Sequence, residues 1–209
     1  MPVESTQYPV NLVLEGRRCL VVGGGPIALR KIEGLLACGA DVTVIAPAVD
    51  DRIRSLPGVR VEQRPYAPGD VAGYRLVVTA TDDSAVNKAV YDDGEAAGVW
   101  VNSADDPLSC SFTLPSVVRR GPLTIAVSTG GHSPALATWL KGRFEAEIGP
   151  EYETLLELLS AERESLKSQG RSTEGLAWRK ALESDMLALI RAGKVHEARE
   201  RLQACLSSL

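Results

Sequence analysis

A chain of 209 residues with 44% hydrophobic and 24% charged residues has the composition of an ordinary globular protein with a sizeable core. Its 27 acidic residues outnumber its 23 basic ones, which argues against a nucleic-acid partner bound by a basic stripe. No apolar run approaches the roughly 20 residues that span a bilayer, and no secretory signal is visible, so we expect a cytoplasmic protein without a membrane partner.

The first half of the chain alternates short β-branched runs with helical stretches. Strands are predicted at 17–22, 41–45, 59–63, 76–80 and 99–102, and helices at 27–38 and 87–97. Strands separated by helices of this length indicate βαβ units and a parallel sheet. Runs such as Leu20-Val21-Val22 are continuously apolar, as buried parallel strands are. The expected fold class is therefore α/β, with a Rossmann-type parallel sheet.

The pattern changes after about residue 112. Strands are predicted at 112–114 and 123–127, with Arg119-Arg120-Gly121-Pro122 as the turn between them. Ser133-Pro134 then supplies a capping hydroxyl and a first-turn proline for a helix that ends at Gly149-Pro150. The rest of the chain carries apolar stripes typical of helices. We expect a Rossmann domain over 1–112, a strand-helix segment over 113–150 and a helical domain over 151–209.

The turn after the first strand matches a dinucleotide-binding pattern. Gly23, Gly25 and Ala28 fit G-x-G-x-x-G/A, between a strand and a helix. The first glycine makes the tight turn, the second lets the backbone approach a pyrophosphate, and the small third residue allows close packing of the helix on the strand. The helix N-terminus adds free N–H groups and a positive dipole end. In this context the motif predicts a dinucleotide site, although alone it would indicate only a structural turn.

The acidic residue that usually follows the second strand and binds the adenosine ribose is missing. The segment reads Val44-Ile45-Ala46-Pro47-Ala48. Asp50 or Asp51 could reach the ribose or simply be solvated, and Arg52 or Arg54 could equally meet a 2′-phosphate. The choice between NAD and NADP stays open at this point.

Polar residues follow the fourth and fifth strands, where open α/β sheets place their ligands. In Thr79-Ala80-Thr81-Asp82-Asp83, either aspartate could lie at the site or cap the next helix, which carries Asn87. In Asn102-Ser103-Ala104-Asp105-Asp106-Pro107, a carboxylate at Asp105 would either transfer protons or cap the loop.

A second glycine-rich loop, Ser128-Thr129-Gly130-Gly131-His132-Ser133, precedes the capped helix and is a candidate anion site. His132 is either structural or catalytic, and His196 in the tail is expected to be solvated. The four cysteines form no CxxC pair and are expected to be reduced. No Cys/His cluster has metal-ligand spacing, so no bound metal is expected.

These blocks together resemble the N-terminal module of siroheme synthase, which is also the stand-alone precorrin-2 dehydrogenase, with or without sirohydrochlorin ferrochelatase activity. The resemblance covers roughly residues 8 to 145. It rests on residues 21–31, 80–83 with Asn87, 102–107 with Ser111-Phe112, 114–116, and 126–131 with Ser133-Pro134.

The resemblance implies an NAD-binding Rossmann domain, a dimerisation segment over 113–150, and a homodimer. It implies oxidation of precorrin-2 to sirohydrochlorin with NAD taking the hydride, and in bifunctional members insertion of ferrous iron to give siroheme. The key aspartate of the family falls on Asp105. The loop hydroxyl that some members phosphorylate falls on Thr129, beside Ser128.

The expected site follows from these two lines of reasoning. Asp105 is expected to accept the proton that leaves the macrocycle. The residues expected to bind NAD are Gly23, Gly25, Pro26, Ile27, Ala46, Pro47, Thr81, Asp82 and Asn102. A polycarboxylate substrate needs basic and polar partners, and the residues expected to bind it are Ser128, Thr129, His132, Arg119 and Arg120. The arginine pair is alternatively a solvated basic turn.

Two other functions remain open on the residues alone. A non-catalytic NAD-sensing regulatory domain would explain the glycine turn, but it gives no role to Asp105 or to the loop at 128–134. A Rossmann reductase of a small metabolite would need a compact carboxylate pocket in place of a broad cleft.

Overall fold

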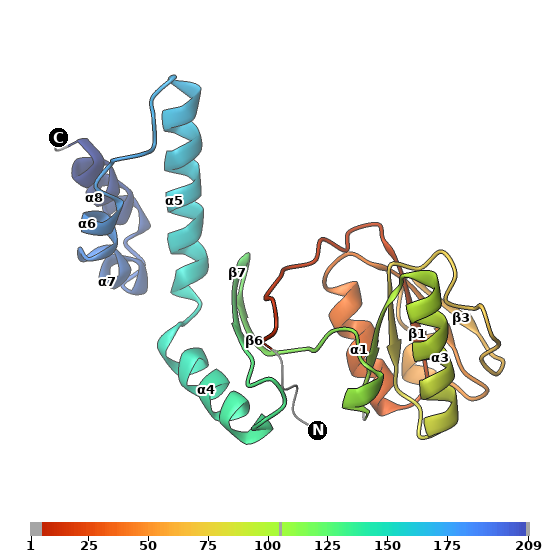
Figure 1. Cartoon of the computed structure of the whole chain (residues 1–209). Helices are drawn as coiled ribbons and strands as arrows, with labels where there is room; N and C mark the ends of the chain where they lie inside the picture. Colours follow the sequence, from red (N-terminus) through yellow and green to blue (C-terminus); the bar gives the residue numbers. More distant parts are fainter. Residues whose placement is uncertain (1–5, 105, 208–209) are drawn as a thin grey trace. The chain divides into compact units, whose positions relative to one another are not determined.

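The protein is described by a computed structural model over residues 6–104 and 106–207, and it divides into two compact units (Figure 1). Unit 1 contains the chain up to residue 114 together with 129–133. Unit 2 contains residues 115–128 and the chain from 134 onward. Each unit has a hydrophobic core of its own.

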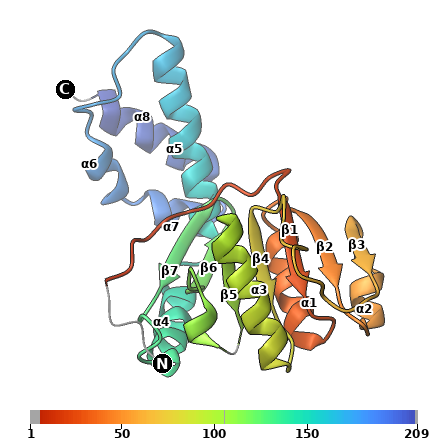
Figure 2. The same ribbon diagram turned by 45° about the vertical axis from the view of Figure 1, so that its right-hand side comes forward.

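Unit 1 is built on a five-stranded parallel sheet of order β3-β2-β1-β4-β5 (Figure 2). The strands are β1 (Arg18–Val22), β2 (Asp41–Ile45), β3 (Val59–Glu62), β4 (Leu76–Thr79) and β5 (Trp100–Ser103). Each strand lies within one residue of its predicted bounds, so the predicted Rossmann-type α/β fold is confirmed. The strand order reverses between β1 and β4, which is where such sheets bind ligands.

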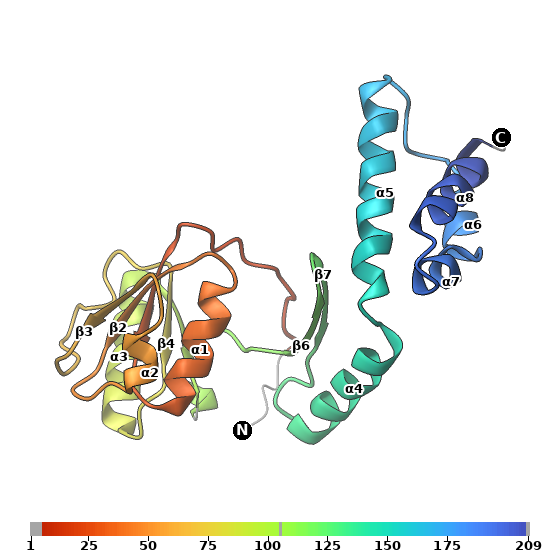
Figure 3. The same cartoon turned by 180° about the vertical axis from the view of Figure 1, so that it is seen from behind.

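Helices cover both faces of this sheet, with α1 and α3 on opposite sides (Figures 1 and 3). The helices of unit 1 are α1 (Pro26–Leu36), α2 (Asp51–Arg54), α3 (Ser84–Ala97) and the 3₁₀ turn η1 (Pro107–Ser109). Along β1, Cys19 and Val21 pack in the core under α1, whereas Leu20 and Val22 pack in the core under α3. Burial of both faces explains why β1 is continuously apolar.

Helix α3 begins three residues earlier than the predicted start at Asn87. The Asp83 carboxylate accepts the N–H groups of Ala85 and Val86 at 2.9 and 3.2 Å and thereby caps the first turn. The predicted end is confirmed, because Gly98 adopts the left-handed conformation, with φ +67°, that closes the helix.

Unit 2 consists of a β-hairpin followed by helices. The strands are β6 (Ser116–Arg120) and β7 (Leu123–Val127), and the helices are α4 (Pro134–Glu147), α5 (Glu151–Ser168), α6 (Trp178–Leu182), α7 (Met186–Arg191) and α8 (Val195–Ser207). The last four helices enclose one core, in which Leu158, Met186 and Leu202 are fully or almost fully buried. The predicted helical character of the tail is confirmed. No helix in the described part of the chain is long and apolar enough to cross a membrane.

Two predictions around this hairpin are wrong. The strand expected at 112–114 is absent, because the Phe112 carbonyl accepts a hydrogen bond from the Asn102 side chain and not from a neighbouring strand. Arg119 and Arg120 belong to β6 and not to the turn. The pairing of Arg120 with Leu123 leaves a two-residue connection, in which Gly121 supplies a positive φ of 52°.

Candidate dinucleotide-binding and active site

A cleft of about 420 Å³ opens at the carboxyl ends of β1, β2 and β4 in unit 1. It is lined by the glycine turn after β1, by the segment that ends β2, by the segment after β4 and by the residues that follow β3. Eight of the nine residues predicted to bind the cofactor line it: Gly23, Gly25, Pro26, Ile27, Ala46, Pro47, Thr81 and Asp82. The cleft therefore lies at the point where the strand order reverses, between β1 and β4.

The three glycines of the turn have different physical reasons to lack a side chain. A Cβ on Gly23, whose φ is +136°, would lie 2.3 Å from the Ala80 carbonyl oxygen, and one on Gly24 would lie 2.0 Å from that of Ala48. A Cβ on Gly25 would meet nothing within 4 Å. The protein's own backbone excludes side chains at the first two positions. At Gly25, the open space belongs to the cleft.

The start of α1 completes an anion site at this turn. Gly25 is the N-cap of α1, and it has no side chain that could bond the first-turn N–H groups. Pro26 occupies the first helical position, and both it and Ile27 line the cleft. The unpaired N–H groups and the positive end of the helix dipole suit a pyrophosphate. Ala28, the small third residue of the motif, is fully buried against the sheet. The turn therefore fits a dinucleotide.

Hydrogen bonds between Thr81, which lines the cleft after β4, and Asn87 tie this part of the cleft to α3. The Asn87 amide donates to the Thr81 carbonyl at 3.0 Å, and the Thr81 hydroxyl lies 3.0 Å from Asn87 Oδ1. The Asp83 N–H donates to the same hydroxyl at 3.1 Å. Of the two aspartates, Asp83 is the cap of α3, and Asp82 lines the cleft. This network gives the buried Asn87 a structural role at the site.

The end of β5 lies beside β4 but not in the lining of the cleft. Asn102, the ninth predicted cofactor residue, is 6% exposed and donates to the Phe112 carbonyl at 2.9 Å. Ser103 pairs in register with Thr79, and the hydroxyls of both are buried without a hydrogen-bond partner among the described residues. Asn102 thus ties the following loop to the strand.

Asp105 lies outside the described residues, but its two neighbours are placed. The Ala104 N–H donates to the Thr79 carbonyl at 2.9 Å. The Asp106 carboxylate accepts the Leu108 N–H at 3.1 Å and the Ser109 hydroxyl at 2.6 Å, and the bond from Ser109 lowers its pKa. Asp106 is therefore the cap of η1.

Sequence reasoning missed Cys110, which closes the loop that begins at Ser103. Its Sγ accepts the Ser103 N–H at 3.1 Å and lies 3.4 Å from the Asp106 carbonyl oxygen. Burial raises the pKa of this thiol, which keeps it protonated and able to donate. Nothing in the sequence indicated this role, because a single cysteine in a loop belongs to no recognised motif.

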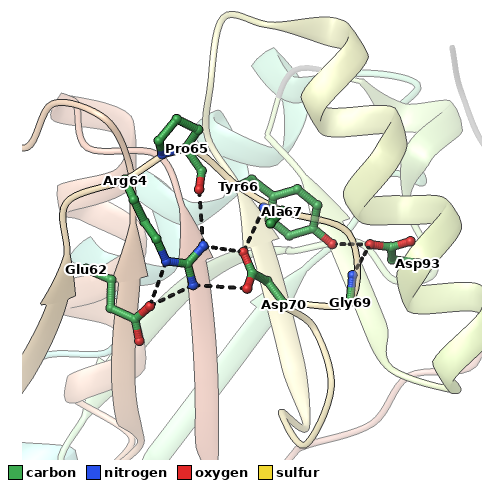
Figure 4. A network of polar contacts seen from close by, with 8 residues as sticks. All are labelled: Glu62, Arg64, Pro65, Tyr66, Ala67, Gly69, Asp70 and Asp93. Carbon is green, nitrogen blue, oxygen red and sulfur yellow. Dashed lines mark hydrogen bonds and ion pairs between the residues drawn. The ribbon is translucent and has the colours of Figure 1, made fainter.

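Sequence reasoning also missed Tyr66, which follows β3 in the chain and lines the cleft. Figure 4 shows its hydroxyl directed toward Asp93. Its hydroxyl donates to Asp93 of α3 at 2.5 Å, and burial together with this bond raises the pKa of the phenol. Arg64, two residues earlier, bridges Glu62 at 2.7 Å and Asp70 at 2.6 Å. These contacts tie the segment that follows β3 to Asp70 and to α3, and no sequence motif predicts them.

The residues predicted to bind substrate fall into different units. In unit 1, the Thr129 hydroxyl accepts the Ser133 N–H at 3.1 Å, and the Thr129 carbonyl accepts the His132 N–H at 2.9 Å. Ser128 belongs to unit 2, as do Arg119 and Arg120.

The two arginines differ sharply in their surroundings. The Arg120 guanidinium donates to the carbonyls of Ile148 at 2.7 Å and Glu145 at 3.0 Å, so it binds the C-terminal end of α4. Arg119, which points to the other face of β6, is exposed. Arg120 therefore has a structural role at the C-terminal end of α4.

Comparisons with known proteins agree with this geometry. A family model described as "Putative NAD(P)-binding" matches residues 10–116, and one described as "Sirohaem biosynthesis protein central" matches residues 120–147. The solved structure "SirC, precorrin-2 dehydrogenase" is 30% identical with a TM-score of 0.72, and the match covers 95% of this chain and 100% of that one. The predicted nicotinamide-dinucleotide cofactor is thereby supported.

Curated relatives include siroheme synthases from Nitrosococcus oceani, 38% identical, and Thioalkalivibrio sulfidiphilus, 37% identical. Each match covers 96% of this chain but only 44% and 42% of the respective relative. The chain thus spans less than half the length of these relatives, whereas it spans all of SirC. On the family models and the full-length match to SirC, the chain belongs to the family of precorrin-2 dehydrogenases that also forms part of the siroheme synthases.

Proposed function

We propose that this chain oxidises precorrin-2 to sirohydrochlorin, with NAD as the hydride acceptor, as a step of siroheme biosynthesis in the cytoplasm. The observation that carries the proposal is the match to a precorrin-2 dehydrogenase over the whole of both chains. The cleft at the strand reversal supports it, because the glycine turn and the start of α1 suit a dinucleotide pyrophosphate.

In this reaction the residues of the chain bind the cofactor and accept a proton from the substrate. NAD, when bound, supplies the acceptor for the hydride. The turn at Gly23 and Gly25 and the start of α1 hold its pyrophosphate, and Thr81 and Asp82 line the same cleft. We assign Asp105 as the general base that takes the proton lost from the macrocycle.

Incubation of the purified chain with precorrin-2 and NAD tests the proposal directly. Formation of NADH together with the absorption spectrum of sirohydrochlorin is the expected result. Binding of NAD without turnover would favour a regulatory NAD-sensing domain. Turnover of a small hydroxy or keto acid in place of the tetrapyrrole would favour a different Rossmann reductase.

We extend the proposal to insertion of ferrous iron into the sirohydrochlorin product. Metal entry requires the pyrrole nitrogens to lose protons, and the carboxylate proposed for the first step would accept them. Adding ferrous iron to the completed oxidation and following the appearance of siroheme, with and without the protein, measures this activity. A rate equal to that of the protein-free reaction would restrict the chain to dehydrogenation.

For the substrate we propose Arg119, Ser128, Thr129 and His132 as polar contacts of the tetrapyrrole carboxylates. Arg119→Ala is expected to raise the Kd for precorrin-2 by about 1.4-fold to fivefold at low salt, because exposed charge pairs contribute about 0.2–1 kcal/mol. The effect should shrink as salt rises. Fluorescence titration with substrate measures it.

Arg179→Ala is the matched control, because Arg179 lies on α6, is 89% exposed and pairs with Glu183. Substrate affinity equal in the Arg119 and Arg179 variants at low salt would remove Arg119 from the site. Arg120→Ala is expected instead to lower the melting temperature, since it removes the donors to the end of α4.

We also propose that the chain forms a homodimer through α4. Ala137 is the only buried residue of this helix, whereas Leu136 is 46% and Trp139 57% exposed. Trp139→Ala is expected to weaken the dimer by about 2–4 kcal/mol, as for a buried aromatic anchor. Sedimentation velocity over a concentration series measures this. Trp100 on β5, which is 47% exposed, provides the control, and equal dissociation of the Trp100→Ala and Trp139→Ala proteins would count against α4.

A further inference from the structure

The glycine turn does not distinguish NAD from NADP, since both cofactors carry the same pyrophosphate. They differ only at the adenosine 2′ position, which bears a hydroxyl in one and a phosphate in the other. Rossmann domains read that position with residues that follow the second strand. In this chain those residues are Ala46, Pro47 and Ala48, which line the cleft and carry no charge.

The first carboxylate after β2 is that of Asp50, and its backbone is fixed against the glycine turn. The Asp50 N–H donates to the Gly24 carbonyl at 2.9 Å. A Cβ on Gly24 would lie 2.0 Å from the Ala48 carbonyl oxygen and 2.9 Å from the Val49 Cα, so the segment 48–50 packs directly against the turn. On the other side, the Asp50 carboxylate accepts the Arg52 N–H at 2.9 Å and caps α2. Asp50 is thus held beside the phosphate turn.

The Arg52 guanidinium is closed on the same carboxylate. Its Nε lies 3.1 Å from Oδ1, and its Nη2 lies 2.6 Å from Oδ2. These hydrogen bonds from Arg52 lower the pKa of Asp50 to about 2, so the carboxylate is ionised at neutral pH. The hydrogen bonds to Asp50 in turn raise the pKa of Arg52, and the charge of Glu33 on α1 adds a smaller effect in the same direction. Two guanidinium donors are therefore engaged by a neighbouring anion.

The next arginine along the chain is engaged as well. Arg54 Nη2 donates to Gln63 Oε1 at 2.7 Å, and Arg54 Nε lies 3.7 Å from Asp51. Gln63 in turn donates to the Pro47 carbonyl at 3.2 Å, which links this pair to the lining of the cleft. Arg52 and Arg54, which follow the cleft-lining segment after β2, are therefore each paired with a carboxylate.

We propose that Asp50 makes the cleft selective for NAD over NADP, by keeping Arg52 paired and by opposing a 2′-phosphate with its own charge. A 2′-hydroxyl carries no charge and is not repelled. A 2′-phosphate would be repelled by the Asp50 carboxylate, and Arg52 could not neutralise the phosphate because its guanidinium is already bound to Asp50. The inference rests on the proposed function only in that the cleft binds a nicotinamide dinucleotide.

The Asp50→Asn protein tests this role. Asparagine caps a helix as well as aspartate does, so α2 is preserved while the charge and the ion pair are lost. Calorimetric titrations of the full chain with NAD and NADP at low salt give the ratio of the two Kd values. This ratio is expected to shift toward NADP by about tenfold or more, because a charge-assisted bond from Arg52 replaces a repulsion. Asp92→Asn is the matched control: it makes the same charge change and also breaks an exposed ion pair, with Lys88 on α3, but Asp92 does not line the cleft, so the parental ratio should be kept.

A second variant makes the test independent of the folding of the first. Arg52→Gln leaves the Asp50 charge unpaired, so NADP affinity should fall several-fold below the parental value while NAD affinity is maintained. A parental preference for NADP, an unchanged ratio in a folded Asp50→Asn protein, or unchanged NADP affinity in Arg52→Gln would overturn the role of Asp50. A parent protein that binds neither dinucleotide would overturn the proposed function itself.

Discussion

The Gly25→Val protein is expected to fold and to lose NAD affinity by about a hundredfold or more. The backbone of Gly25, with φ −95° and ψ −170°, lies in a region that valine adopts readily, and a Cβ there meets no protein atom within 4 Å. The loss of glycine as N-cap costs about 0.5–1 kcal/mol. The added methyl groups would occupy the space next to the helix N-terminus, where two or more charge-assisted bonds of about 1.5–3 kcal/mol each would hold the pyrophosphate.

Calorimetry with NAD and thermal melting of the same sample separate the two effects. Gly34→Val is the matched control, since Gly34 lies in α1 with nothing within 4 Å of its Cβ and does not line the cleft. It should retain parental affinity. Gly24→Ala should instead lower the melting temperature, because its Cβ meets the Ala48 carbonyl at 2.0 Å. Parental NAD affinity in Gly25→Val would contradict the assignment of the turn.

The parallel sheet could be predicted because its signals are local. Most of the strands are short β-branched runs, and β1, β2 and β4 are buried along almost their whole length, so they read as continuous apolar segments. The hairpin in unit 2 was harder, because Arg119 and Arg120 resemble a polar turn. Arg120 belongs to β6 because its backbone pairs with Leu123, and its guanidinium bonds carbonyls at the end of α4 that lie 25 and 28 residues further along the chain.

The cofactor cleft could be predicted to a similar extent, because most of it follows strand ends that are recognisable from the sequence. Asn102 was expected in that cleft from its place at the end of the fifth strand, but its side chain bonds the Phe112 carbonyl. Tyr66 and Cys110 could not be found this way, since their partners, Asp93 and Ser103, depend on how distant segments fold back. Strand ends predict where a site lies, and loop contacts determine which side chains complete it.

Asp105→Asn is expected to lower the rate of precorrin-2 oxidation by about 10²–10⁴-fold, the usual contribution of a general base. In the sequence, Asp105 comes two residues after the end of β5, and open α/β sheets bind ligands at the carboxyl ends of their strands. The residue just before it is held by the hydrogen bond from the Ala104 N–H to the Thr79 carbonyl. Asparagine keeps the size and hydrogen bonding of aspartate but has no basic oxygen. NAD affinity should stay close to parental, because the pyrophosphate binds at the glycine turn. Initial rates of NADH formation at saturating substrate measure the effect.

Asp106→Asn is the matched control for this substitution. The Asp106 carboxylate caps η1 through the N–H of Leu108, and an asparagine oxygen can accept the same bond, so the rate should remain close to parental. If the chain also inserts iron, Asp105→Asn should slow that step too, because both reactions remove protons from the same macrocycle. Oxidation of precorrin-2 by Asp105→Asn at the parental rate would rule out Asp105 as the base. Equal slowing by both substitutions would indicate that the loop is needed only for its shape.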